Sequence, residues 1–191
     1  NELKRKKLPE LDEEFAKDVS EFDTLEEYKA DLRKKLEERA KEREEAYKRD
    51  TVVEQAAANA EMDIPEVMIE HEMEHMFRDL EQRLQIQGMT MDMYYQFSGT
   101  DEESVRAQFR EDAEKRVRIS LTLEAIAKAE NIEVTEEELE EEIKKMAELY
   151  QLEADKMKER LNLLGQLESL KYDLKMRKTI DFLVNNSVTA A

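Results

Sequence analysis

Apolar residues recur at intervals of three and four along most of this chain, which is the spacing of one face of an α-helix. Two similar stripes follow Pro65 and Thr135. Their members are Ile69, Met73, Met76, Phe77 and Leu80 in the first, and Leu139, Ile143, Met146, Ala147 and Tyr150 in the second. No segment of the sequence alternates apolar and polar residues in the manner of a strand. The pattern predicts an all-α fold.

Each stripe follows a related short sequence, so the chain contains an internal repeat. The first copy runs from Ala60 to Glu66 and the second from Ala129 to Glu136, with one residue inserted. Each copy lies between a long charged helix and a shorter amphipathic one, which predicts two similar helix–turn–helix units. We expect an elongated multi-helix domain with a central helical body and two projecting arms, at about residues 62–116 and 132–175.

Capping residues and breakers predict the helix boundaries. The expected capping pairs are Thr24 with Glu27, Asp63 with Glu66, Thr100 with Glu103, and Thr135 with Glu138. The expected helices cover approximately residues 10–20, 24–60, 63–87, 100–130, 135–150, 154–164 and 166–185. Leu11, Phe15 and Val19 should be buried by the first of them. The body should come from residues 52–60, 117–129 and 176–188, with 119–129 buried nearly all round.

The domain is expected to cover residues 10–191. Residues 1–9 are basic and end near Pro9, and they are expected to be a linker from an upstream domain that this chain lacks.

Composition narrows the classes of partner. The 191 residues carry 49 acidic and 31 basic side chains, and the net charge of −18 argues against nucleic acid, whose phosphates it would repel. No run of about 18 apolar residues is present, so no membrane partner is expected. The absence of Cys excludes disulfides, thiol catalysis and Cys-based zinc sites, and fits a reducing compartment.

One short motif could carry chemistry. His71-Glu72-Met73-Glu74-His75 matches the His-Glu-x-x-His pattern of zinc proteases, in which both imidazoles must turn inward and meet a third ligand. The apolar stripe is centred on Met73, so both histidines should point away from it into water. Zinc proteolysis through His71, Glu72 and His75 stays an alternative. A di-iron site needs its Glu-x-x-His element twice, which 2 histidines cannot supply.

Other catalytic patterns are missing from the sequence. Its 3 glycines cannot form a phosphate-binding loop, and no nucleophile lies in a Gly-x-Ser-x-Gly setting. Acidic runs such as residues 136–142 are most simply solvated helix faces. We therefore expect no enzyme activity, no catalytic or metal site, and no cofactor.

Two groups of apolar residues are candidates for binding a partner. The first lies between two glycines and consists of Met89, Met91, Met93, Tyr94 and Phe97, with Tyr95 among them. A short loop cannot easily bury so many large side chains, and methionine adapts to varied partners. The second group consists of Met146, Tyr150, Met157 and Leu161. Packing inside each arm is the alternative for both groups, and the inner part of each could pack while the outer part binds.

Several ordered stretches carry a resemblance to a known family. They are Leu8 to Asp18, Ile64-Pro65-Glu66, Gln87-Gly88-Met89, Ala113 to Val117, Glu124 to Ala127, Glu130 to Glu137, and Met146-Ala147-x-x-Tyr150. The series covers nearly the whole chain and resembles the C-terminal substrate-binding domain of trigger factor, a family of ribosome-associated chaperones of the bacterial cytoplasm. The resemblance implies an ATP-independent holdase, whose arms and body form a cradle for apolar segments of nascent or unfolded polypeptides.

The resemblance also implies particular residues and partners. Met146 and Tyr150 fall where the family contacts clients with its second arm, and Met157 and Leu161 fall close to two further contacts. The sequence has no Gly-Phe-Arg-type ribosome-docking signature and no prolyl isomerase domain. The ribosome would therefore be a partner only through the absent N-terminal domain. A homodimer is left open, because apolar cradles often pair with each other.

Three other functions are weighed against this one. A helical scaffold or self-associating coiled coil needs sustained heptads, whereas these stripes break after a few turns. The zinc metalloprotease would need stoichiometric zinc and hydrolytic activity. A periplasmic helical chaperone of the parvulin-associated type shares the helical design, and a precursor signal peptide would identify it.

Overall fold

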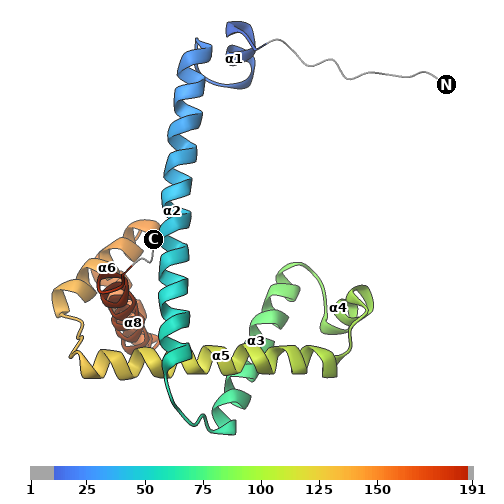
Figure 1. Cartoon of the computed structure of the whole chain (residues 1–191), viewed down its shortest axis with the longest axis vertical. Coiled ribbons are helices and arrows are strands. Elements are labelled where there is room, and N and C mark those ends of the chain that lie inside the picture. The colour runs from blue at the N-terminus through green and yellow to red at the C-terminus, as the bar shows by residue number, and fades with distance from the viewer. Residues whose placement is uncertain (1–10, 189–191) are drawn as a thin grey trace. The chain divides into compact units, whose positions relative to one another are not determined.

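The computed structural model describes residues 11–188, and all regular secondary structure within them is α-helical (Figure 1). Eight helices occur in this range: α1 (Glu13–Val19), α2 (Leu25–Asn59), α3 (Glu66–Ile86), α4 (Met91–Ser98), α5 (Glu102–Ala129), α6 (Glu136–Leu149), α7 (Ala154–Leu163) and α8 (Leu167–Asn185). The predicted all-α class is confirmed. None of the described helices combines the length and the apolar character that crossing a membrane requires. The linker predicted at residues 1–9 lies outside the described residues.

The chain divides into two compact units, Asn1–Lys48 and Arg49–Ala191, with the boundary inside α2. In the described part of the first unit, Asp12 caps α1 by accepting a hydrogen bond from the Phe15 N–H at 2.9 Å. The predicted burial of Leu11 and Val19 is wrong, because both are exposed and Ala16 is the buried residue of α1. The helix has only 7 residues, so Leu11 precedes it and Val19 ends it.

The capping box predicted at the start of α2 is confirmed. Thr24 Oγ1 accepts from the Glu27 N–H at 3.2 Å, and Glu27 Oε2 accepts from the Thr24 N–H at 3.3 Å. Every residue from 32 to 47 is exposed, and Lys48 pairs with Glu44 one helical turn away at 2.6 Å. This stretch is therefore a solvated helix held by local interactions.

The first arm packs α3 against the N-terminal half of α5, and α4 contacts α3. Its core is small: Ile69, Met76 and Ala113 are buried, and Ile64, Met73 and Phe109 pack around them. The rings of Phe77 and Phe109 lie 4.8 Å apart between centroids. The stripe predicted from the sequence therefore forms the inner face of α3.

Two predicted caps of this arm are wrong. Helix α3 begins after Pro65, which offers no side-chain cap, so Asp63 lies too far upstream; Arg110 instead forms a bidentate pair with Glu66. Helix α5 is capped by Asp101, whose carboxylate accepts from the Ser104 N–H at 2.8 Å. The Thr100 hydroxyl instead shares a hydrogen bond with Ser98 at 2.7 Å.

The second arm contains α6, α7 and the N-terminal part of α8 around a larger core. Its buried members are Val134, Leu139, Ile143, Ala147, Met157, Leu161 and Leu170. The predicted capping box is present: Thr135 Oγ1 accepts from the Glu138 N–H at 3.2 Å, and Glu138 Oε2 accepts from the Thr135 N–H at 2.8 Å.

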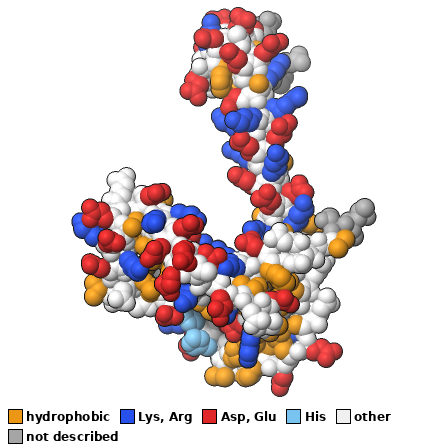
Figure 2. Space-filling model, turned by 90° about the vertical axis from the view of Figure 1, so that its left-hand side faces the viewer, with side chains coloured by type: hydrophobic (Ala, Val, Ile, Leu, Met, Phe, Trp, Pro, Cys, Tyr) orange, Lys and Arg blue, Asp and Glu red, His pale blue; other side chains and the backbone are white. Residues whose placement is uncertain are grey.

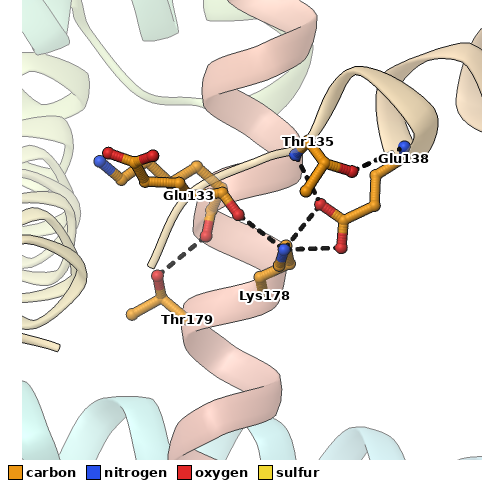
Figure 3. Close-up of polar contacts among 6 residues, drawn as sticks. Glu133, Thr135, Glu138, Lys178 and Thr179 are labelled. Atoms are coloured by element: carbon orange, nitrogen blue, oxygen red, sulfur yellow. Dashed lines mark hydrogen bonds and ion pairs between the residues drawn. The ribbon is translucent and has the colours of Figure 1, made fainter. Parts of the chain in front are cut away.

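One lysine of α8 joins that capping box to the rest of the arm (Figure 3). Lys178 Nζ donates to both carboxylate oxygens of Glu138, at 2.6 and 2.7 Å, and to the Glu133 carbonyl oxygen at 2.6 Å. Beside it, Arg177 donates to Glu142 at 2.6 Å. The start of α6 is therefore fixed to α8 by polar contacts as well as by the apolar core.

The body is formed where α5 meets α8, and Arg49 in the C-terminal half of α2 pairs with Asp181 of α8. The predicted burial of residues 119–129 is only partly right: Leu123 and Ala127 are buried, but Ala125 and Ala129 are exposed. A helix in contact with neighbours on two sides keeps a third side in water.

The capping box of the second arm gives a stability prediction. Replacing an N-cap threonine by alanine costs about 1 kcal/mol, because an N–H of the first turn loses its partner. We expect Thr135→Ala to lower the free energy of unfolding in urea by about that amount. Thr100→Ala is the control, since that threonine caps no helix. An equal loss in both variants would contradict the assigned roles.

Low pH should lower the stability of the second arm. Hydrogen bonds from Lys178 and Arg177 are the main reason why the pKa values of Glu138 and Glu142 lie below the ordinary 4.5. The unfolded chain binds these protons more readily, so the stability from both pairs is present above the unfolded pKa and is lost as the pH falls through the folded pKa. We expect the free energy of unfolding to fall between about pH 5 and pH 3, and less steeply in Glu138→Gln/Glu142→Gln. Parallel pH curves for variant and wild type would refute this.

Candidate functional site

The four residues predicted on the second arm line one cavity. Its volume is about 240 Å³, and Met146, Tyr150, Met157 and Leu161 contribute to its walls. Arg160, Leu164 and Gln166 complete the lining. We call this the second-arm cavity. Residues from α6, α7 and the turn before α8 thus come together as the sequence pattern suggested, although they are separated by up to 20 positions in the chain.

These residues differ in how much water they meet. Met157 and Leu161 are 3% and 6% exposed and belong to the buried core of the arm. Met146 is half-buried, whereas Tyr150 is 62% exposed. Met157 and Leu161 therefore form the floor of the second-arm cavity, and Tyr150 and Leu164 form an apolar rim that a partner can reach.

The backbone presents the rim at two turns. Gln151 follows Tyr150 with φ of 54°, and the Leu152 N–H returns to the Ala147 carbonyl at 2.8 Å. Gly165 closes α7 with φ of 65°, and the Gln166 N–H returns to Leu161 at 2.8 Å. Both helices are thus followed by a residue in the left-handed backbone conformation, which turns the chain sharply.

These turns expose more apolar residues than the sequence argument selected as sites. Leu149, Leu152, Leu163 and Leu164 are all exposed at these turns. The signal for Leu163 was its place just before Leu164 and Gly165, because a helix ending there cannot bury consecutive side chains on one face.

The apolar segment of the first arm is a helix rather than the short loop that the sequence suggested. Thr90 Oγ1 accepts from the Met93 N–H at 3.3 Å and starts α4, and Gly99 ends it with φ of 68°. Helix α4 contacts α3 along one side, so the segment is partly folded back.

The five predicted residues of that segment also differ in their exposure to water, as those of the second arm do. Met89, Met91 and Tyr94 are half-buried, whereas Met93 is exposed and Phe97 is 77% exposed. Ile86, the last residue of α3, is also exposed and was missed by the sequence argument. Both arms therefore present large apolar side chains at helix ends. On the face drawn in Figure 2, hydrophobic patches lie between acidic and basic side chains.

The histidine motif lies apart from both candidate surfaces. His71 and His75 are exposed, as the stripe predicted, with ring centroids 4.7 Å apart in an edge-to-face arrangement. Glu72, which would have to act as a free base, pairs with Arg116 at 3.3 Å. Within the described residues, no three His, Cys, Asp or Glu side chains are grouped so that they could hold a metal ion. The geometry gives the zinc protease hypothesis no support.

Comparison with solved structures agrees with the helical fold. Domains of trigger factor from Thermotoga maritima match with a TM-score of 0.56 at 22% identity, over 74% of this chain and 81% of theirs. A second structure, described as showing promiscuous substrate recognition in folding and assembly activities of the trigger factor chaperone, matches with a TM-score of 0.55 at 26% identity. That match covers 95% of this chain and 44% of the other.

Curated trigger factor sequences are more similar to this chain than these solved structures are. The trigger factors of Geobacillus sp. strain WCH70 and Brevibacillus brevis are 61% and 53% identical over the whole chain, and in each case the chain spans 44% of the relative's length. The family model of the bacterial trigger factor C-terminus matches residues 24–185. By this match and these identities, the chain belongs to the trigger factor family and corresponds to its C-terminal part.

Proposed function

We propose that this chain is a chaperone segment that holds exposed apolar stretches of unfolded or nascent polypeptides without using ATP. The observation that carries the proposal is the second-arm cavity, with its apolar floor and the exposed rim of Tyr150 and Leu164. Soluble proteins seldom leave several large apolar side chains together in water unless a partner covers them. The family membership supports the same function, and substrate recognition is named for one of the similar structures.

The binding surfaces are small and separate, which accounts for holding and release without nucleotide. Covering apolar surface contributes about 25 cal/mol per Å² removed from water, so one rim binds weakly. Several weak contacts along one client raise the overall affinity, while each can still dissociate quickly. Met93 and Phe97 of α4 provide a second such surface. The arms at about 62–116 and 132–175 would together hold one client.

In this proposal, the buried candidate residues contact a client only at the floor of the second-arm cavity. Met157 and Leu161 shape the floor, and a side chain entering between Tyr150 and Leu164 would reach them. Methionine at such a floor adapts to aliphatic and aromatic guests, which suits a binder of many clients.

The net charge affects the solubility of the loaded complex and the preference among clients. With a net charge of −18, a loaded complex repels its copies and stays in solution. Acidic side chains around the apolar patches should also favour clients whose apolar stretches have basic flanks. We infer action in the bacterial cytoplasm, where the ribosome would be reached only through a domain upstream of this segment.

The test is suppression of aggregation of a chemically denatured client protein, without nucleotide. In Tyr150→Glu/Leu164→Glu, two exposed rim residues become charged while the core keeps its residues. Each lost apolar contact of this size costs about 1.5 kcal/mol, so the concentration for half-maximal suppression should rise by about tenfold or more.

The matched control is Leu36→Glu/Tyr47→Glu, which introduces the same charges at exposed residues of α2. This variant should act like wild type. Suppression that survives the rim changes but is lost in Ile86→Glu/Phe97→Glu would move the principal site to the first arm. No suppression by wild type at severalfold molar excess would refute the chaperone function and favour a helical scaffold.

A further inference from the structure

The two histidines of the chain lie one helical turn apart on α3, and neither candidate binding surface includes them. His71 and His75 occupy positions whose Cβ atoms are about 5–6 Å apart on one face of a helix. Both side chains are exposed, and in Figure 2 histidine side chains, drawn in pale blue, lie open at the surface. The chain therefore has all of its imidazole groups in one accessible place.

The two rings are close enough to share a metal ion. Their centroids lie 4.7 Å apart, with the ring planes at 76° to each other. A transition-metal ion binds an imidazole nitrogen at about 2.0–2.1 Å, so two nitrogens that share the ion must lie about 3 Å apart. Each ring nitrogen lies to one side of its ring centre. Rotation about the side-chain torsions of these two exposed residues can therefore point both nitrogens at one ion.

The backbone beneath the pair is held in place by the core of the first arm. Ile69 and Met76, on the other side of α3, are buried in that core, where α3 packs on α5. Glu72, which lies between the two histidines in the sequence, pairs with Arg116 of α5 at 3.3 Å. These contacts fix the turn of α3 that carries both imidazoles. Because the site is preorganised, little conformational entropy is lost when an ion binds.

The charges around the pair favour a cation. Glu70 and Glu74 are exposed on the same helix, and the net charge of the chain is −18. A negative field raises the local concentration of cations. The nitrogen ligands then select among them, because imidazole suits Cu²⁺, Ni²⁺ and Zn²⁺, whereas Mg²⁺ and Ca²⁺ prefer oxygen ligands.

We propose that His71 and His75 form a two-histidine site for a divalent transition-metal ion, with Cu²⁺ bound more tightly than Ni²⁺ or Zn²⁺. Among residues 11–188, these histidines belong to no group of three metal-binding side chains, so water would fill the other coordination positions. The site differs from that of a zinc protease, which needs a third protein ligand and a free base. For this pair alone, the proposal replaces the expectation that the chain binds no metal.

Ion binding should also stabilise the first arm. The unfolded chain does not hold the two imidazoles on one helical turn, so it binds the ion less tightly than the folded chain does. A ligand that prefers the folded state raises the stability of that state. This inference does not depend on the proposed chaperone function and concerns other residues.

The test is calorimetric titration of the whole chain with Ni²⁺ in the presence of excess Mg²⁺. The Mg²⁺ competes for the many carboxylates and leaves the imidazoles free. We expect a single Ni²⁺ to bind to each chain. Either His71→Ala or His75→Ala should lower the affinity by on the order of a hundredfold, because the second ligand of a chelate binds intramolecularly.

A matched control keeps two histidines but separates them. In His75→Gln/Glu81→His the two imidazoles lie about 15 Å apart along the helix axis, too far to share an ion. Glu81 is exposed, so the core keeps its residues. This variant should bind Ni²⁺ as weakly as the variants with one histidine. An affinity equal to that of wild type would show binding to isolated side chains only and would overturn the proposed chelate.

Thermal unfolding followed by circular dichroism gives a second measurement. Saturating Ni²⁺ should raise the melting temperature of wild type by a few degrees and leave that of the separated variant unchanged. Without the ion, all variants should keep the helical content of wild type, because only exposed side chains change. A melting temperature of wild type that does not respond to Ni²⁺, or responds equally in the separated variant, would refute the site.

Discussion

The main constraint on this molecule is that each arm has apolar residues enough for one narrow core and little more. In the first arm the buried cluster consists of Ile69, Met76 and Ala113, and in the second it is one stripe of α6 with its partners. With 42% charged residues, the other helix faces remain in water. Where a helix ends, its stripe has nothing left to pack against, so residues such as Tyr150 and Phe97 stay exposed. Binding surfaces at the turns are thus a consequence of the thin core.

Polar contacts help to fix the positions of the helices, because the small apolar cores do not do this alone. At the start of α6, Lys178 holds both the Glu133 carbonyl and the Glu138 carboxylate. In the first arm, Arg118 donates to the Ala60 carbonyl at 3.3 Å, and Arg110 pairs with Glu66. In each copy of the repeat, a basic side chain from a later helix therefore binds a backbone carbonyl. The sequence repeat is matched by a repeat of the contacts at the start of each arm.

Periodicity and capping chemistry made most of the fold predictable, because they are local. The all-α class, the inner faces of α3 and α6, and the caps at Thr24 and Thr135 followed from spacing alone. Competition between neighbouring caps was not predictable: Asp101 displaced Thr100, and Pro65 moved the start of α3. The division of Met157 and Leu161 from Tyr150 also depends on which helix covers each side chain, which one stripe cannot show.

The central claim is that clients are held at the turns of the arms and not along the charged helix. Hydrogen–deuterium exchange of the chain with and without an unfolded client tests it directly. The account predicts slower exchange of backbone amides at residues 149–166 and 86–97 in the complex, and no change at the solvated residues 32–47 of α2. Protection at residues 32–47, or unchanged exchange at both turns while the client is bound, would contradict it.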